Sequence, residues 1–216
     1  MATKINVERR YDATGRQARA EQLRDEVLQC ARTLFLEHGY ASTTVSAVAA
    51  AAGVSAEMVY KAFGGKPGIV RTIFERSLLG SGPGPAELRS DAAQLASTNP
   101  RGLFRQLGTL SAEVAPLTAP IMRLIRDAAA GGDTAMSTLL HDIEHNRYER
   151  MLHNAEVLER RGFLRAEIPA AHAADVMWLY TADDLFNNLV LSRRWPLNAY
   201  GQFIANALFA ALSADT

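Results

Sequence analysis

The chain has 216 residues, of which 48% are hydrophobic, and it contains one cysteine and equal numbers of basic and acidic residues. This length suits one large domain, or a small domain joined to a larger one, with enough apolar material for a core. A single cysteine excludes an internal disulfide and a cysteine-rich metal site. No apolar stretch is long enough to span a bilayer and the polar N-terminus has no signal-peptide core, so we expect a cytoplasmic protein that makes no membrane contact.

The neutral total conceals an asymmetry along the chain. Residues 1–80 contain 11 basic and 8 acidic residues, whereas residues 81–216 contain 12 basic and 15 acidic residues. Because phosphate contacts dominate the affinity of proteins for DNA, the local charge of a binding face matters more than the total charge. The N-terminal part is therefore the better candidate for contact with nucleic acid.

Residues 1–20 form a polar arm that lacks hydrophobic periodicity. Its basic residues are Lys4, Arg9, Arg10, Arg16 and Arg19. Two interpretations stay open: a disordered, solvated tail, or an arm that contacts phosphates or the minor groove beside the main site. Beyond the arm, apolar residues recur at helical spacing from Leu23 to Phe35, and Gly39 is suited to end this helix. Cys30 lies on the apolar stripe, which indicates a small core residue.

Residues 44–63 have the pattern of a helix-turn-helix. Thr44 can cap a first short helix, because its hydroxyl can accept from a backbone N–H that the helix leaves unpaired. Gly53 suits a sharp turn, and Ser55 can cap the second helix, predicted at residues 56–62. Two caps separated by a glycine turn are typical of the motif.

The second helix of the motif has one apolar side. Val59 and Phe63 lie four residues apart and are predicted to be buried. The other sides are left to Ala56, Glu57, Met58, Tyr60 and Lys61.

This segment resembles the N-terminal signature of TetR-type transcriptional regulators. The matching residues are Gly39-Tyr40, Thr43-Thr44, Val48-Ala49, Ala52-Gly53-Val54-Ser55, Tyr60, Phe63 and Lys66. The resemblance covers residues 19–79 and implies that the second helix enters the major groove with its N-terminal residues at the base edges. The residues that it places at the DNA are Thr43, Thr44, Ser55, Ala56, Glu57, Met58, Tyr60, Lys61 and Lys66.

The sequence departs from that pattern in three places. Ala47 stands where an acid would complete a capping box with Thr44. Ala62 stands where the family often has a polar or aromatic residue. Residues 64–67 (GGKP) replace the commoner serine-lysine-glutamate, and the two glycines add backbone freedom next to Lys66. Glu57 is repelled by phosphate but can accept from cytosine N4, so we interpret it as a specificity residue.

The glycine- and proline-rich run at residues 80–85 is the clearest interruption of helical pattern in the chain and predicts a domain boundary. We therefore expect an arm at 1–20, a DNA-binding domain at 21–80 and a ligand-binding and dimerisation domain at 81–216. Further helices are predicted at about 66–79, 86–97, 101–115, 119–130, 133–161, 169–193 and 197–213. No alternating strand pattern is present. The predicted fold is all-α, with a three-helix DNA-binding domain followed by a larger helical regulatory domain.

The C-terminal part resembles a regulatory domain common in actinobacterial regulators at residues 124–129, 158–165, 173–178 and 194–200. That resemblance implies a homodimer in which helices 169–193 and 197–213 pair with their copies, and both segments are rich in apolar residues. Two recognition helices related by a twofold axis, about 34–36 Å apart, would read a palindromic operator.

A ligand pocket is expected among helices 101–115, 119–130, 133–161 and 169–193. The candidate lining residues are Phe104, Arg123, Asp127, Tyr148, Met151, Met177, Trp178, Asp183, Asp184 and Asn187. Asp183 and Asp184 lie in an apolar segment and need partners, which Arg126 or Arg123 could provide. His141 and His145 have a spacing able to bind a metal but lack a third ligand, so we expect none.

The sequence therefore predicts a ligand-responsive repressor that binds double-stranded DNA as a homodimer and is released by a small apolar or amphipathic effector. It offers no nucleophile–base pair and no phosphate-binding loop, so we expect neither an enzyme nor a cofactor. The alternative is an activator or protein-interaction module of the same fold without a small-molecule inducer.

Overall fold

The computed structural model describes the backbone of residues 4–213, and their side chains from residue 15 onward. This part of the chain is helical and has no strand, although Leu164 and Ser213 form an isolated bridge, and the all-α prediction is confirmed. None of its helices has an apolar stretch of the length needed to cross a bilayer. The chain divides into two compact units, the first ending at Ile73 and the second beginning at Phe74.

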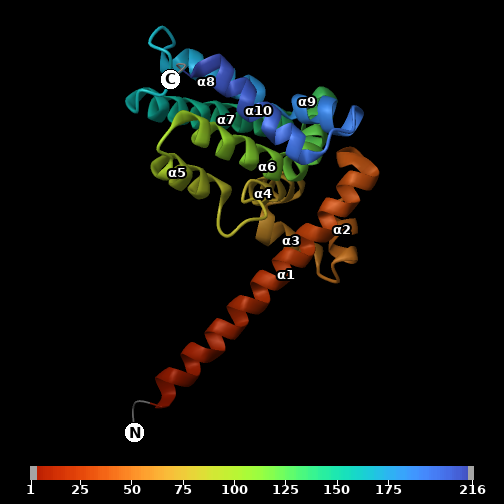
Figure 1. The fold of residues 1–216 in the computed structure, drawn as a ribbon. Helices are drawn as coiled ribbons and strands as arrows, with labels where there is room; N and C mark the ends of the chain where they lie inside the picture. Colours follow the sequence, from red (N-terminus) through yellow and green to blue (C-terminus); the bar gives the residue numbers. More distant parts are fainter. Residues whose placement is uncertain (1–3, 214–216) are drawn as a thin grey trace. The chain divides into compact units, whose positions relative to one another are not determined.

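The first unit contains α1 (Lys4–Ser42), α2 (Val45–Ala51), α3 (Ala56–Phe63) and the start of α4 (Lys66–Ser77) (Figure 1). The regular course of α1 is interrupted at Gly39, whose φ of 81° lies in a region that favours glycine, as predicted for the end of this helix.

The polar arm is helical where its backbone is described, rather than a disordered tail. Residues 16–22 (RQARAEQ) are strong helix formers, so propensity favours the helix even though hydrophobic periodicity is absent. The side chains of Lys4, Arg9 and Arg10 lie outside the described part, so contact of the arm with phosphates or the minor groove stays one interpretation that the structure does not test.

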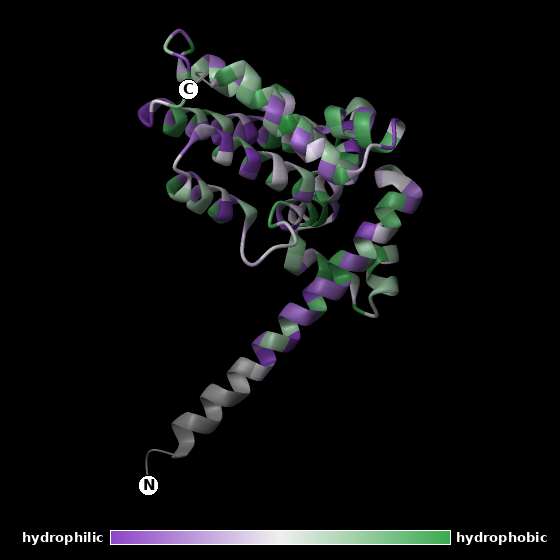
Figure 2. Ribbon diagram, viewed as in Figure 1, coloured by the Kyte–Doolittle hydropathy of each residue, from purple (hydrophilic) through white to green (hydrophobic). Residues whose placement is uncertain are grey.

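Hydrophilic and hydrophobic residues alternate along α1 from residue 15 onward (Figure 2). Its apolar stripe includes Val27, Ala31 and Phe35, all of which are buried as the spacing predicts. Val59 and Phe63 of α3 are buried as well, as expected. Burial of these stripes fixes which side of α3 faces outward.

The second unit contains α5 (Ala86–Ala96), α6 (Pro100–Ala130), α7 (Thr134–Arg160), α8 (Ala170–Tyr180), α9 (Asp183–Phe186), the π-helix η1 (Asn187–Ser192) and α10 (Leu197–Leu212). The long helices α6 and α10 lie side by side (Figure 1), and α7 packs against both α6 and α8. Side-chain caps begin α6 at Asn99 and α7 at Asp133, since each accepts a hydrogen bond from a backbone N–H of the first turn.

Two predicted helix boundaries are wrong. Segments 101–115 and 119–130 form one helix, α6, with Pro116 and Pro120 inside it. A proline in a helix removes one backbone hydrogen bond. Here the residues that follow, including Ile121 and Met122, are fully buried, so packing outweighs that loss.

The segment predicted as a helix at 169–193 is interrupted. Regular helix ends at Tyr180, Ala182 has an extended backbone, and α9 is followed by the π-helix. The hydroxyl of Thr181 donates to the carbonyl of Met177 at 2.9 Å, which satisfies a carbonyl at the end of α8.

The core of the second unit is formed by residues from α6, α7, α8 and α10. Its fully buried large side chains include Phe104, Leu158, Met177, Tyr200 and Leu208. The rings of Phe186 and Tyr200 meet edge to face with centroids 5.7 Å apart.

The glycine- and proline-rich run lies inside the second unit, where Glu113 of α6 holds it. The carboxylate of Glu113 accepts hydrogen bonds from the backbone N–H groups of Ser81 (2.6 Å) and Gly82 (3.0 Å). Arg89 donates to both of its oxygens, at 2.5 and 2.8 Å. The hydrogen bond from Arg89 lowers the pKa of Glu113 to about 2. A domain boundary at this run stays a prediction.

Glu113→Gln is expected to lower the free energy of unfolding at pH 7 by about 1–3 kcal/mol, since hydrogen bonds to a charged group are lost. Because the pKa of Glu113 is lowered in the folded state, its stabilisation is present above the ordinary pKa of 4.5 and disappears as the pH falls towards 2. Urea unfolding should therefore show the deficit shrinking with acid. Glu87→Gln, in a side chain that is 71% exposed, is the control and should have little effect. A deficit that is the same at pH 7 and pH 3 would contradict this assignment.

Candidate DNA-binding surface and ligand site

The two caps expected from the sequence are present, Thr44 at the start of α2 and Ser55 at the start of α3. The hydroxyl oxygen of Thr44 accepts from the backbone N–H of Ala47 at 3.1 Å, and that of Ser55 accepts from Met58 at 3.1 Å. Gly53 has a φ of 66°, and the N–H of Val54 donates to the carbonyl of Ala49. Local hydrogen bonds of this kind define the angle between the two helices, which is why the sequence predicts this part well.

The outward side of α3 carries the residues expected to read DNA. Glu57, Met58, Tyr60 and Lys61 are exposed, and Tyr60 is 56% exposed despite its aromatic ring. Ser55 is also exposed but uses its hydroxyl as the cap, while Ala56 is half-buried. An exposed side with a phenol, an ammonium and the positive N-terminal end of a helix suits contact with a phosphate backbone.

Lys66 has a partner within the first unit. Its ammonium donates to the carbonyl of Tyr40 at 2.8 Å and lies 4.1 Å from the centroid of the Tyr40 ring. A cation above an aromatic ring and on a carbonyl is stabilised by both. Lys66 therefore joins the end of α1 to the start of α4, a role that the sequence did not predict.

Thr43 is buried, with 2% of its surface exposed. Its hydroxyl donates to the carbonyls of Gly39 (2.8 Å) and Leu34 (3.2 Å). In this structure Thr43 satisfies carbonyls at the end of α1 and offers no surface to DNA, unlike the neighbouring Thr44, which is exposed.

The three glycines between α3 and the first turn of α4, Gly64, Gly65 and Gly68, each have a structural reason. Gly64 and Gly65 have φ values of 72° and 108°, in the left-handed region. Gly68, in the first turn of α4, lies against the end of α3, where an added Cβ would overlap the carbonyl oxygen of Phe63. The three glycines therefore allow the corner between α3 and α4, and the added backbone freedom expected at Gly64 and Gly65 stays a prediction.

The predicted ligand residues do not form one group. Phe104 and Met177 are buried in the core of the second unit. Arg123 and Asp127 are exposed on α6 and pair with each other at 3.8 Å, and Asp184 is exposed as well. The half-buried members are Tyr148, Met151, Trp178, Asp183 and Asn187. His141 and His145 are exposed on α7.

Asp183 belongs to a cluster of four charged residues, Arg126, Glu144, Arg147 and Asp183, which we call the Arg126 cluster. Arg126 lies 3.6 Å from the carboxylates of both Asp183 and Asp184, so it is the partner that the sequence left open between Arg126 and Arg123. Glu144 joins the two arginines, accepting from Arg126 at 2.9 Å and from Arg147 at 2.8 Å.

Burial acts differently on the two acids of the Arg126 cluster. Burial raises the pKa of Asp183, whose side chain is 14% exposed, and the attraction of Arg126 and Arg147 opposes that rise. Burial alone would also raise the pKa of Glu144, but its hydrogen bonds from Arg147 and Arg126 lower that pKa below its ordinary value.

Trp178 lies next to the Arg126 cluster. The guanidinium of Arg147 is 4.4 Å from the centroid of the Trp178 ring and donates to the Trp178 carbonyl at 2.6 Å. The hydroxyl of Thr181 points to the sulfur of Met151 at 3.8 Å. The indole N–H of Trp178 is buried and has no hydrogen-bond partner among the described residues. An unpaired buried donor is costly, so an acceptor bound beside the indole N–H would stabilise it.

The apolar residues of the predicted dimer helices divide between core and surface. Phe186, Ile204, Leu208 and Leu212 are buried within the second unit. The larger exposed ones include Leu179, Leu191 and Leu197, and Trp195, between the two segments, is exposed as well. Pairing of these helices with a second copy stays a prediction.

Comparison with known proteins gives a sequence match in the first unit and a fold match over most of the chain. Residues 27–73 match the sequence profile of "Bacterial regulatory proteins, tetR family". No curated protein sequence matches this chain.

Three solved structures illustrate the likeness in fold. The complex of SmeT with triclosan is 20% identical, with a TM-score of 0.70 over 90% of this chain and 93% of SmeT, which is the repressor of a Stenotrophomonas maltophilia multidrug efflux pump. NalD of Pseudomonas aeruginosa, the secondary repressor of an efflux pump, is 19% identical, with a TM-score of 0.69 over 91% and 100% of the two chains. KstR2, a ketosteroid transcriptional regulator of Mycobacterium tuberculosis, is 17% identical, with a TM-score of 0.56 over 89% and 95%.

Gly68→Ala is expected to lower the stability of the first unit by about 1–3 kcal/mol, because the added methyl group overlaps the Phe63 carbonyl and forces α3 and α4 apart. The matched control is Gly15→Ala on α1, where no atom lies within 4 Å of the added Cβ and a gain of up to about 1 kcal/mol is expected. Thermal unfolding followed by circular dichroism measures both. Equal effects of the two substitutions would contradict the close contact between the helices.

Proposed function

We propose that this chain, which belongs to the tetR family of bacterial regulatory proteins, is a repressor that binds a palindromic operator as a homodimer and leaves it when a small molecule binds. The exposed side of α3 carries the proposal, since Tyr60 and Lys61 lie there beside a capped helix N-terminus. A single helix of this length contacts few bases, so two copies are needed for specific affinity. In this proposal, residues 55–58 face base edges, while Thr44, Tyr60 and Lys61 face phosphates.

Release would follow from a shift between two conformations of the dimer that differ in the spacing of the recognition helices. A ligand moves such an equilibrium only by its differential affinity for the two states. α4 is the covalent connection between the two units, because the boundary falls within it. Movement of α4 is therefore the simplest way for events in the second unit to reach α3.

Tyr60→Phe is expected to weaken binding to every DNA sequence by a similar factor, about fivefold, because a phosphate contact carries no sequence information.

Lys66→Ala should weaken binding as well, but through loss of first-unit stability, since the ammonium of Lys66 donates to the carbonyl of Tyr40. Glu57→Ala should change base preference more than affinity, because a carboxylate accepts from cytosine. Glu37→Ala, at an exposed position of α1, is the control.

Fluorescence anisotropy of labelled operator measures the affinities of the wild-type chain and the variants, and binding-site selection measures their base preferences. A repressor of the proposed kind selects two inverted half-sites about 10 base pairs apart. Selection of a single half-site would contradict the homodimer, and an unchanged preference for Glu57→Ala would contradict its assigned role. Absence of any selected sequence would favour the alternative, an interaction module of the same fold.

The effector is proposed to be a small amphipathic molecule that accepts a hydrogen bond from the indole of Trp178, among Tyr148, Met151 and Asp183. The unpaired buried donor supports this position. The sulfur and aromatic side chains there suit an apolar body, and the Arg126 cluster suits a polar end.

Triclosan, the ligand in the SmeT structure, is a suitable probe because it joins two aromatic rings to a hydroxyl. It is expected to displace operator DNA from the wild-type chain and from Trp195→Phe, a variant in an exposed residue. Trp178→Phe removes the N–H and should raise the required concentration about tenfold, in line with the loss of one hydrogen bond. Displacement is measured by fluorescence anisotropy of labelled operator. Equal responses of the two tryptophan variants would place the effector elsewhere.

A further inference from the structure

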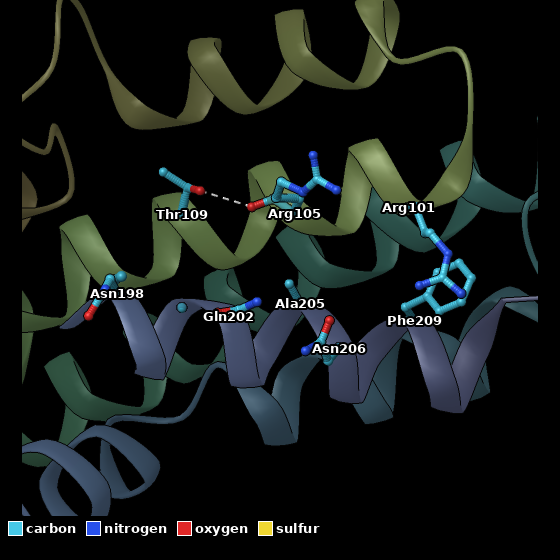
Figure 3. A pocket seen from close by; sticks show the side chains of 10 residues that line it. Arg101, Arg105, Thr109, Asn198, Gln202, Ala205, Asn206 and Phe209 are labelled. Atoms are coloured by element: carbon cyan, nitrogen blue, oxygen red, sulfur yellow. Dashed lines mark hydrogen bonds between the residues drawn. The ribbon is translucent and has the colours of Figure 1, made fainter. Parts of the chain in front are cut away.

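A hollow of about 340 Å³ lies between the N-terminal half of α6 and the outer side of α10. Figure 3 shows Arg105 and Thr109 extending from α6 and Gln202 and Asn206 extending from α10. The volume is within the range of small-molecule sites, which is about 300–1,000 Å³. The hollow shares no residue with the effector position proposed around Trp178.

Small residues where the two helices cross create this hollow. α6 and α10 meet backbone to backbone, because an added Cβ on Gly108 would overlap the carbonyl oxygen of Gly201. On Gly201, an added Cβ would lie 2.7 Å from the carbonyl oxygen of Gly108. The hollow is also lined by Ala112 and Ala205, so the long polar side chains stand around a floor of small ones.

The lining is cationic in a unit that is otherwise rich in acid. It contains two arginines and no carboxylate, although residues 81–216 carry 12 basic and 15 acidic residues. Most arginines of this unit bind an acid or a backbone carbonyl through the guanidinium. The guanidinium of Arg105 has no carboxylate within ion-pair distance among the described residues. Arg101 lies on the ring of Phe209 at 4.1 Å.

The remaining polar groups are amides and a hydroxyl at helical spacing. Asn198, Gln202 and Asn206 follow one another every four residues on α10, opposite Arg101, Arg105 and Thr109 on α6. Amides donate and accept in a fixed plane, and a guanidinium presents a fork of N–H groups that matches two oxygens of an oxyanion. The α6 N-terminus at Pro100 adds a positive potential near Arg101.

We propose that this groove binds a small molecule with an oxyanion group, a carboxylate or a phosphate, which Arg105 holds while the amides of α10 bind its polar substituents. The ring of Phe209 provides an apolar wall for the rest of the molecule. The proposal is independent of DNA binding and of the Trp178 effector position, so it is tested without operator DNA. It requires that the proposed homodimer leave free the side of α10 that carries Gln202 and Asn206.

Benzoate and inorganic phosphate are the probes. Benzamide, which has the shape of benzoate but no charge, is the control. Titration of the full chain, followed by saturation-transfer NMR for the aromatic probes and by calorimetry for phosphate, is expected to show saturable binding of at least one oxyanion and not of benzamide. Binding of benzoate alone assigns the groove to carboxylates, and binding of phosphate alone assigns it to phosphate groups. Arg105→Gln and Gln202→Ala should each weaken the bound oxyanion about tenfold. The matched control is Arg123→Gln, since Arg123 is 77% exposed on the same helix and already pairs with Asp127.

Three results would overturn the proposal. The first is the absence of saturable binding of either oxyanion. The second is an equal loss of binding with Arg105→Gln and Arg123→Gln. The third is a change in the dimer dissociation constant of Arg105→Gln, measured by sedimentation, without an effect on oxyanion binding. That outcome would show that a second copy of the chain fills the groove.

Discussion

The close approach of backbones where a Cβ would not fit is the constraint on which both units depend. Gly68 lets the first turn of α4 pack directly on the carbonyl of Phe63 at the end of α3. This contact sets the angle between α3 and α4. Gly108 and Gly201 let α6 and α10 touch along their backbones, and the side chains on either side must then spread apart. The same steric fact thus orients the helix proposed to read DNA and opens the groove proposed to bind an oxyanion.

The part of the structure that could be predicted from the sequence is the part held by local interactions. The caps at Thr44 and Ser55 and the turn at Gly53 use hydrogen bonds between residues a few positions apart, so their pattern is visible in the chain. Pro116 misled the prediction for α6, because the packing that keeps the helix continuous comes from residues distant in sequence. For the same reason the contact of Lys66 with Tyr40 could not be foreseen. The burial of Thr43 was also missed, although its hydrogen bond to the Gly39 carbonyl spans only four residues.

Electrostatics in the second unit follow a similar division. The sequence showed that Asp183 needs a partner, and Arg126 provides it, but the bridging role of Glu144 depends on how α6 and α7 pack. With Glu144 and Arg147 included, the Arg126 cluster pairs two cations with two anions. Their mutual attraction offsets part of the desolvation free energy of each buried charge. Arg105 is left outside any such pairing and lines the groove, and these two observations together support its proposed role in binding an oxyanion.

The left-handed backbone at Gly64 has a consequence for the chirality of the chain. L-Amino acids resist a φ of 72°, whereas D-amino acids, their mirror images, prefer it. A semisynthetic chain with D-alanine at this position would therefore keep the fold. It would gain stability because the unfolded chain would have fewer backbone conformations available. Handedness at this one α-carbon thus offers a chemical means of stiffening the junction behind the recognition helix without altering any side chain that faces DNA.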